Sequence, residues 1–549
     1  MTPNETTPQE TKPQETTSHD TLTTPALIAR GAARYGARIA IETPEESLSY
    51  AQLDAARIEA ARALMACGIA PGERVAIWAP NLAEWIVAAL AIQSVGAALV
   101  PVNTRMKGLE AGAILADSGA RVLFSCGAFL GEDYPAMLAP HRPATLERVI
   151  VFGGAPGTDD AACTGNTAHR DESWQQFLAR ASDTPLEAFR AREAQVGPDT
   201  LMDVMFTSGT TGRPKGVMTT HGQNVRAAHG WAEIATLREG DRYLIVSPFF
   251  HAFGYKAGWL AALTSGATVL PHLVFDPLAV LERVVRERVS VLPGPPTLYH
   301  ALLETPGLAG LDLSSLRVAV TGAAAIAPSL VERMRAELNF ETVLTGYGLT
   351  ESCGFATLCR HGDDAVTVAQ TSGRAMPGME LRIAGPDGAP LAPGETGEVW
   401  VRGYNVMRGY LNDAAATAQA VDAQGWLHTG DLGTLDARGY LRVTDRIKDM
   451  FIVGGFNCYP AEIERLFAAH EAVAQVAVVG MPDARLGEVG HAYVVLRAGA
   501  HADAASLTEW ARRNMANYKV PRRIEIVEAL PVSAAGKVLK YRLREGAPA

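Results

Sequence analysis

The stretch over residues 74–102 most constrains the fold, because it predicts a strand, a helix and a second strand in immediate succession. The segments RVAIWAP and AALVPV are short and apolar, and NLAEWIVAALAIQSVG between them is long enough for a helix. Two strands joined through a helix usually lie parallel in one sheet, so the pattern favours a βαβ unit. A membrane span over residues 85–102 is disfavoured, because this run contains Gln93, Ser94 and Gly96.

Similar units recur along the chain and predict an α/β fold. Strand-like segments lie at 121–126, 147–153, 203–206, 242–248, 267–271, 289–296 and 317–325, whereas residues 154–198 are polar and predict an irregular surface segment. After about Gly373 the sequence alternates and turns often, as antiparallel strands do. Beyond Arg446, we expect helices at 460–470 and 504–517 and strands at 475–479 and 491–496. The predicted fold is therefore a large N-terminal domain of βα-layered sheets with a β-rich subdomain, followed by a small α+β C-terminal domain.

The limits of the domains follow from composition. Residues 1–20, MTPNETTPQETKPQETTSHD, contain almost nothing to bury and predict a disordered tail. This tail lacks the apolar region of a secretory signal. We expect the domain boundary within Asp445–Asp449, which gives an N-terminal domain over residues 21–447 and a C-terminal domain over residues 448–549.

Charge and cysteine usage argue against several classes of protein. The chain of 549 residues has a formal net charge of −10 and no long basic run, so nucleic acid is not expected as a partner. Its six cysteines form no C-x-x-C pair, so neither a zinc site nor a disulfide framework is indicated. Free thiols are typical of a reducing cytosol, and we expect a cytoplasmic protein without an integral membrane segment.

The segment FTSGTTGRPKG, residues 206–216, predicts a phosphate-binding loop. Its glycines let the backbone approach an anion closely, and its hydroxyl groups and Lys215 can donate hydrogen bonds to phosphate oxygens. It differs from a Walker A loop, which ends in Gly-Lys-Ser/Thr, since Lys215 stands between Pro214 and Gly216.

Four further segments carry groups suited to nucleotide chemistry. Taken singly, each has an ordinary structural explanation as a packed tyrosine, a turn aspartate, a solvated linker or a surface lysine. They are GYGLTES at 346–352, GWLHTGD at 425–431, DRIKDMFIVGGFNCYPAEIE at 445–464 and SAAGKVLK at 533–540.

Together and in this order, these segments resemble the adenylate-forming superfamily of acyl-CoA synthetases, peptide-synthetase adenylation domains and beetle luciferases. The resemblance covers essentially the whole chain after the tail. It implies a small mobile C-terminal lid and identifies the loop at 206–216 as the one that holds the pyrophosphate of ATP. It also implies two steps. A carboxylate attacks the α-phosphate of ATP to give acyl-AMP and pyrophosphate, and the thiol of CoA then takes the acyl group.

The resemblance assigns roles residue by residue. Glu351 and Thr207 would hold Mg²⁺, and Lys537 would reach the α-phosphate and the substrate carboxylate. Arg446 is equally well explained by a structural salt bridge. The full implied set for ATP and AMP is Thr207, Ser208, Gly209, Thr210, Thr211, Gly212, Lys215, Gly322, Ala323, Ala324, Gly346, Tyr347, Gly348, Thr350, Asp431 and Arg446.

The lid and the CoA path follow from the same resemblance. Lys448 matches the hinge about which the lid rotates between the two steps. After that rotation, Gly454 and Gly455 would help to form the tunnel for the pantetheine arm of CoA.

The acyl pocket is expected around residues 249–259. His251 matches a residue that gates the acyl tunnel, and Phe253, Tyr255, Lys256 and Trp259 are the expected pocket residues. The ordinary explanation has Tyr255 packed and Lys256 extended to solvent. The alternative is a pocket that accepts oxygen atoms on a bulky acid. The segments FHAFGYKAG and LPGPPT look most like those of the bacterial CoA ligases that activate a steroid-derived indane-propionate.

We therefore expect an ATP-dependent carboxylic acid–CoA ligase that uses ATP, CoA and Mg²⁺. The alternatives are a medium- or long-chain fatty acyl-CoA synthetase and, outside the enzymes, a non-catalytic adenylate-binding protein, which intact Glu351, Asp431 and Lys537 disfavour. An amino-acid adenylation domain would carry an Asp near Phe250, and the sequence has none there. A luciferase-type oxygenase stays an alternative activity, and a homodimer is an alternative to a monomer as the assembly.

Overall fold

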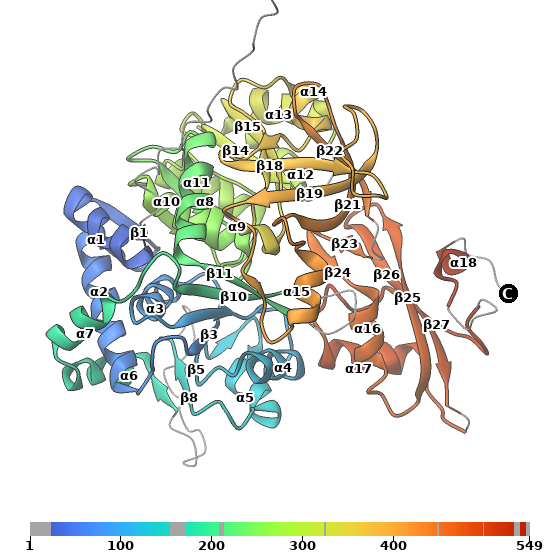
Figure 1. The fold of residues 1–549 in the computed structure, drawn as a ribbon, viewed down its shortest axis with the longest axis horizontal. Helices are drawn as coiled ribbons and strands as arrows, with labels where there is room; N and C mark the ends of the chain where they lie inside the picture. Colours follow the sequence, from blue (N-terminus) through green and yellow to red (C-terminus); the bar gives the residue numbers. More distant parts are fainter. Residues whose placement is uncertain are drawn as a thin grey trace, which may run out of the picture.

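The computed structural model describes residues 23–153, 171–207, 214–322, 326–446, 450–497, 499–531 and 538–544. Figure 1 shows a large domain, coloured from blue through yellow to light orange, and a smaller C-terminal domain in darker orange and red at its side. The predicted α/β class, with a large N-terminal and a small C-terminal domain, is confirmed. The predicted tail at 1–20 and the boundary between Ile447 and Lys448 lie outside the described residues.

The strand–helix–strand unit is present as predicted. β3 (Arg74–Trp78) and β4 (Ala98–Pro101) are parallel neighbours, and α3 (Ala83–Ser94) connects them. Every residue of α3 except Glu84 is buried. The helix is apolar on all sides because other elements of the domain cover it, which explains its likeness to a membrane span. Within the described residues, no helix is long and apolar enough to cross a membrane.

The sheet built on this unit also carries the ends of the predicted phosphate loop. Its strands from β4 to β8 run parallel, and β10 and β11 add an antiparallel hairpin on the other side of β4. In spatial order the strands are β20 (Gly409–Tyr410), β11 (Lys215–Thr220), β10 (Leu201–Thr207), β4, β3, β5 (Val122–Ser125), β8 (Arg148–Val151) and β9 (Glu172–Ser173).

Two further sheets lie above this one in the view of Figure 1, and parallel bridges of Val291 to Tyr243 and Val318 link them. The predicted strand at 289–296 is wrong, because this segment forms the bridges of Val291 but no continuous strand. Pro293, Pro295 and Pro296 have no N–H group to donate to a neighbouring strand. The first of these sheets has the strand order β12 (Arg242–Ile245), β13 (Thr268–Pro271), β1 (Ile39–Glu42), β2 (Ser47–Ser49). The second has the order β14 (Val318–Gly322), β15 (Thr342–Tyr347), β16 (Thr357–Leu358), β17 (Arg374–Ala375).

The β-rich subdomain after Gly373 and the C-terminal domain also follow the sequence pattern. The subdomain is an antiparallel sheet in the order β18 (Met379–Ala384), β19 (Gly397–Gly403), β21 (Leu427–Leu435), β22 (Leu441–Arg446). The C-terminal sheet has the order β24 (Phe456–Cys458), β23 (Phe451–Val453), β26 (Gly487–Leu496), β25 (Val473–Asp483), with β27 (Arg523–Ile526) paired to β26. Its helices are α16 (Pro460–Phe467), α17 (Ala504–Asn514) and α18 (Lys540–Arg544).

The polar segment before the phosphate loop is not wholly irregular. Residues 171–198 contain two α-helices, joined by a 3-10 turn, and these helices bury Trp174, Phe177 and Phe189. The irregular prediction is therefore wrong there, because a few large apolar side chains anchor helices whose other residues are polar. The remaining α-helices of the large domain are α1 (Thr24–Tyr35), α2 (Tyr50–Ala66), α4 (Gly108–Ser118), α5 (Tyr134–Leu138), α6 (Trp174–Ala179), α7 (Leu186–Glu193), α8 (His221–Ile234), α9 (Ala252–Gly254), α10 (Ala261–Thr264), α11 (Pro277–Glu287), α12 (Pro296–Leu303), α13 (Pro328–Glu337), α14 (Ala365–Gln370) and α15 (Ala414–Ala420).

Two main hydrophobic cores hold the chain. One extends from Leu27 to Leu441, and the other extends from Phe451 to Ile524 in the C-terminal domain. Leu109 of the large domain packs against the second core. The two domains are therefore in direct apolar contact.

Candidate active site

The hairpin of β10 and β11 positions both ends of the predicted phosphate loop. Thr207 ends β10, Lys215 begins β11, and the two residues are opposite each other in the antiparallel register. Both are half-buried. A Cβ atom on Gly216 would come within 2.8 Å of Val204 Cγ1, so this glycine is required by packing. Ser208, Gly209, Thr210, Thr211 and Gly212 lie outside the described residues.

Glu351 lies next to this hairpin, and Tyr410 orients its carboxylate. Glu351 belongs to the one-turn helix η5 (Thr350–Ser352), and its backbone carbonyl accepts a hydrogen bond of 2.8 Å from Met407 N. The hydroxyl of Tyr410 donates to Glu351 Oε1 at 2.9 Å. Burial and the nearby Glu351 charge raise the pKa of Tyr410 far above its ordinary value, so it remains a donor.

Tyr410 also faces Lys215. The Nζ atom of Lys215 lies 4.9 Å from the centroid of the Tyr410 ring, within the range of a cation–π contact. Tyr410 is held there because β20 pairs with β11, with Tyr410 opposite Val217. Sequence reasoning missed Tyr410, since the local pattern offers no more than a Gly-Tyr pair between polar residues.

The expected nucleotide residues of β14, β15 and β21 come together. Gly322 and Gly346 are neighbours in the parallel register, and a Cβ atom on Gly322 would lie 2.9 Å from Gly346 O. A Cβ atom on Gly348 would lie 2.2 Å from Gly354 O. Backbone packing therefore requires small residues here, whatever else they contact. Ala323 and Ala324 lie outside the described residues.

Tyr347 and Asp431 are in direct contact although 84 positions separate them. The hydroxyl of Tyr347 donates to Asp431 Oδ2 at 2.6 Å, and Asp431 is buried. Thr350 is half-buried at the start of η5. The backbone of Arg446 lies opposite Asp431 in the register of β21 and β22. The predicted adenine and ribose residues thus form one cluster.

His251 caps the helix that begins the expected acyl pocket. Its Nδ1 accepts a hydrogen bond of 3.2 Å from Phe253 N, which places the ring proton on Nε2 in the neutral form. The side chain of His251 is exposed and that of Phe253 is half-buried. Phe253 packs on Trp231 at 5.8 Å between ring centroids, and Trp231 packs on Phe355 at 5.0 Å. An aromatic cluster therefore lies beside His251.

Lys256 is buried, so the expectation that it extends to solvent is wrong. Its side chain is 1% exposed and its Nζ atom lies 3.2 Å from Asp203 Oδ2. Nζ also donates to Thr219 Oγ1 at 3.1 Å, and Thr219 Oγ1 donates to Asp203 Oδ1 at 2.5 Å. Because Asp203 and Thr219 stand on β10 and β11, this ion pair ties the helix after His251 to the hairpin that carries the phosphate loop.

Tyr255 and Trp259 are buried with Lys256. These three residues belong to the π-helical segment η3 (Tyr255–Leu260), and the two aromatic side chains have no accessible surface. Tyr255 OH accepts a hydrogen bond of 2.6 Å from Gln93 Nε2, and its ring stacks on Trp259 at 4.9 Å. Direct contact between these side chains and an acid would require them to move.

Gly454 and Gly455 form the turn between β23 and β24. Both have positive φ angles, of 55° and 88°, which side chains rarely adopt. A Cβ atom on Gly455 would lie 3.7 Å from Pro295 Cβ, so this turn faces the large domain. Lys448 and Lys537 lie outside the described residues.

Glu351 and Thr207 offer oxygen donors that fit a magnesium ion. A carboxylate and the hydroxyl of Thr207 are oxygen ligands of the kind that Mg²⁺ prefers. Among the described residues, no group of three or more His, Cys, Asp or Glu side chains is placed to hold a metal.

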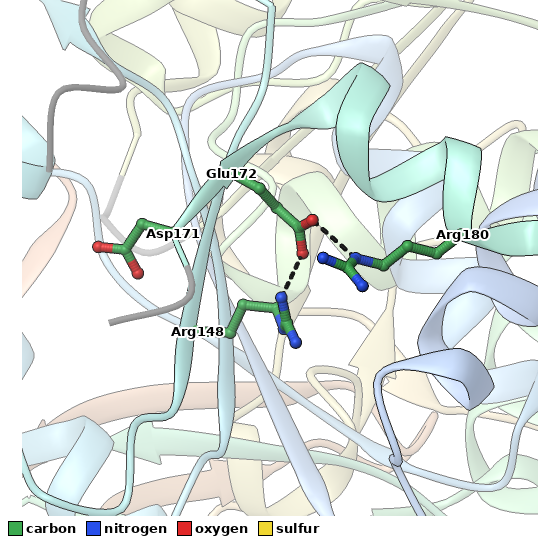
Figure 2. Close-up of a pocket in the computed structure, with 4 residues that line it drawn as sticks. All are labelled: Arg148, Asp171, Glu172 and Arg180. Atoms are coloured by element: carbon green, nitrogen blue, oxygen red, sulfur yellow. Dashed lines mark hydrogen bonds and ion pairs between the residues drawn. The ribbon is translucent and has the colours of Figure 1, made fainter. Parts of the chain in front are cut away.

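A cavity of about 360 Å³ lies at the edge of the sheet opposite to β11 and is lined by charged side chains. Figure 2 shows Glu172 between Arg148 and Arg180, with ion pairs of 2.8 and 2.7 Å. Asp171, which also lines the cavity, pairs with Arg142 at 2.8 Å. The two pairs of Glu172 tie β9 to β8 and to the 3-10 turn that follows α6, and we assign this set of ion pairs a structural role.

The fold agrees with comparisons to known proteins. The profile described as AMP-binding enzyme matches residues 28–411, and the profile of the AMP-binding enzyme C-terminal domain matches residues 462–537. The chain belongs to the AMP-binding enzyme family. Together with its named relatives, this membership makes the protein an acyl-CoA ligase, with ATP, CoA and a small carboxylic acid as substrates.

The relatives cover nearly the whole chain. The 3-[(3aS,4S,7aS)-7a-methyl-1,5-dioxo-octahydro-1H-inden-4-yl]propanoyl:CoA ligase of Mycobacterium tuberculosis is 49% identical over 523 residues, which are 95% of this chain and 98% of that protein. The ligase of the same name from Rhodococcus jostii is 47% identical over 530 residues, again 95% and 98%. Among solved structures, a double mutant of o-succinylbenzoate CoA synthetase from Bacillus subtilis, bound with its product analogue, is 28% identical with a TM-score of 0.77, covering 96% of this chain and 99% of that one.

Proposed function

We propose that this ligase activates a bulky indane-propionate that carries two ketone oxygens. The observation that carries the proposal is the 49% identity to the mycobacterial ligase of such an acid over 95% of the chain. Beside His251, the half-buried Phe253 has accessible ring surface for a fused ring system, and it packs on the buried Trp231, which in turn packs on Phe355. Flat aromatic faces offer a large apolar contact to such rings.

The first step needs two anions to meet, so positive charge and hydrogen-bond donors must be fixed in advance. We propose that Lys215 and Lys537 supply the charge, Lys215 at the pyrophosphate and Lys537 at the α-phosphate and the carboxylate. The acid oxygen bonds to the α-phosphorus while the bond to pyrophosphate breaks. Mg²⁺, held by Glu351 and Thr207 together with phosphate oxygens, would neutralise part of the phosphate charge when bound.

Tyr410 completes this arrangement from the chain's own residues. Its hydroxyl holds Glu351 Oε1, and its ring lies beneath Lys215. One side chain therefore sets the positions of the proposed metal ligand and of the proposed phosphate lysine. We propose that Tyr410 is a positioning residue for adenylate formation.

AMP is proposed to lie along the cluster formed by β14, β15 and β21. Tyr347 would stack on adenine, Asp431 and Arg446 would bind the ribose, and Thr350 would contact the phosphate. The hydrogen bond from Tyr347 to Asp431 supports this arrangement, because it holds the ring and the carboxylate in fixed relative positions. Gly322, Gly346 and Gly348, with Ala323 and Ala324, would leave room for the adenylate, and the loop residues Ser208, Gly209, Thr210, Thr211 and Gly212 would hold the pyrophosphate.

In the second step the thiol sulfur of CoA attacks the acyl carbonyl, AMP leaves, and the thiol proton is released. We propose that the Gly454–Gly455 turn lines the path of the pantetheine arm, which its position against Pro295 supports. The lid would turn about Lys448 between the steps. His251, with its proton on Nε2, is proposed to contact the adenylate at the mouth of the acyl pocket.

The test is pyrophosphate release with and without CoA for three acids: the indane-propionate, an arylpropionate and octanoate. We expect the highest kcat/KM for the indane-propionate. A preference for octanoate would favour a fatty acyl-CoA synthetase instead, and pyrophosphate release without a CoA thioester product would contradict the ligase reaction.

The cellular location and the oligomeric state of the ligase are also proposals. We propose a cytoplasmic location, because ATP and CoA are the co-substrates. A homodimer is proposed as the assembly to test by sedimentation, where a monomer mass would refute it.

A further inference from the structure

Glu110 of the large domain reaches into the C-terminal domain and makes two hydrogen bonds there. It lies on α4, and its Oε1 accepts from Lys519 Nζ at 2.7 Å. Its Oε2 accepts from the backbone N–H of Ala516 at 2.8 Å. Lys519 Nζ also donates to Glu462 Oε1 of α16 at 2.7 Å. The carboxylate of Glu110 thus completes a charged cluster whose other members belong to the C-terminal domain.

This cluster is enclosed by protein. The side chains of Lys519, Glu462 and Glu110 are 0%, 2% and 5% exposed. Burial by itself would lower the pKa of Lys519, but the two carboxylates outweigh burial and hold this pKa well above its ordinary value. Lys519 therefore stays charged. Removing the Glu110 carboxylate would leave the buried N–H of Ala516 without this acceptor. Lys519 would then pair with Glu462 but no longer with Glu110.

Neighbouring contacts cross the same interface. Asn103 Nδ2 donates to Tyr518 OH at 3.1 Å, and the Tyr518 ring stacks on Phe456 at 4.7 Å. The guanidinium of Arg105 lies 4.3 Å from the centroid of the Phe456 ring. Phe456 directly follows Gly455, so these contacts hold the Gly454–Gly455 turn towards the large domain.

In the same orientation, another part of the C-terminal domain lies on the side remote from the large domain. Pro531 and Leu539 flank the segment that contains Lys537, and Leu539 N donates to Pro531 O at 2.8 Å. The following helix, α18, packs on β25. Figure 1 shows α18 on the side of the C-terminal domain remote from the large domain. Bringing this side to the active site would require the Glu110 contacts to break.

We propose that Glu110 is a positioning residue for thioester formation, because it fixes the lid with the Gly454–Gly455 turn against the large domain. Adenylate formation, which we assign to a different lid orientation, then proceeds without Glu110. The inference rests on the proposed two-step function. It adds a residue on α4 that selects one of the two steps.

The experiment measures the two half-reactions separately in Glu110→Ala. Acid-dependent exchange of pyrophosphate into ATP should equal that of the wild type. Thioester formation from supplied acyl-AMP and CoA should fall roughly 10- to 100-fold, the factor expected for loss of hydrogen bonds to a charged group. The rate of thioester formation should fall less in Glu110→Gln, which keeps an acceptor oxygen.

A matched control removes a carboxylate whose ion pair lies within the large domain. Glu147 pairs with Arg121 at 2.8 Å, and Glu147→Ala should leave both half-reactions unchanged. If Glu110→Ala does not fold, Tyr518→Phe serves instead, because it keeps the ring and removes the oxygen that accepts from Asn103. Its thioester rate should fall about 2- to 10-fold.

Hydrogen exchange gives an independent readout. The amide of Ala516 should exchange faster in Glu110→Ala than in the wild type, while amides of the β25–β26 ladder stay protected. Equal loss in both half-reactions, or an unchanged thioester rate, would overturn the proposal. Failure of the proposed function looks different, because then no acid supports pyrophosphate exchange even in the wild type.

Discussion

Tyr410→Phe is the substitution that tests the proposed active site most directly. It removes the hydroxyl that donates to Glu351 Oε1 at 2.9 Å and keeps the ring beneath Lys215. A hydrogen bond to a charged group contributes about 1.5–3 kcal/mol, which corresponds to roughly a 10- to 100-fold change. If Glu351 acts only when held in this position, kcat/KM for pyrophosphate release should fall by that factor.

The assay is continuous detection of pyrophosphate over a series of Mg²⁺ concentrations. We expect a higher Mg²⁺ requirement in the variant, because a carboxylate that rotates freely is a poorer ligand. Tyr440→Phe is a matched control, since Tyr440 OH donates to the Asp363 carboxylate at 2.7 Å elsewhere in the domain. Equal losses in the two variants, or none in Tyr410→Phe, would refute the positioning role of Tyr410.

Three further predictions concern single side chains. Lys537→Ala should reduce adenylate formation roughly 10²–10³-fold while thioester formation from supplied acyl-AMP stays near the wild-type rate, and an equal loss in both would contradict the assignment. Glu351→Gln should shift the dependence of rate on Mg²⁺ to higher concentration, and an unchanged curve would make Glu351 structural. Lys256→Met should lower the free energy of unfolding in urea by about 3–5 kcal/mol, because it leaves Asp203 as a buried charge without its ion pair. The ranking of the three acids should stay the same, whereas a shift towards octanoate would mean that Lys256 contacts the acid.

The arrangement of Lys256 changes the interpretation of the pocket. A lysine in an apolar helix commonly extends its ammonium group to water. Here Asp203 and Thr219, which are 53 and 37 positions away, supply the partners instead. The oxygen-tolerant pocket inferred from Tyr255 and Lys256 therefore has no support from accessible side-chain surface, and the substrate proposal rests on the relatives and on the aromatic cluster.

Local patterns predicted the regular elements well. The apolar runs at 74–78 and 98–101 became neighbouring parallel strands, and the run between them became a helix, because hydrophobic periodicity and βαβ connectivity act within a short stretch of chain. The predicted strand at 289–296 failed where prolines remove hydrogen-bond donors. The predicted irregular segment failed at residues 174–193, where a few buried aromatic side chains anchor two helices.

The sequence by itself determined the order of the elements, the phosphate-loop signature and the family that they resemble, because each depends on residues close together in the chain. The tertiary structure alone decided which side chains meet. Tyr410 contacts a carboxylate 59 positions away, and Glu110 binds a lysine 409 positions away across the domain interface. A hydrogen bond or ion pair depends on distance in space, and packing of sheets and domains sets that distance without leaving a periodic signal in the sequence.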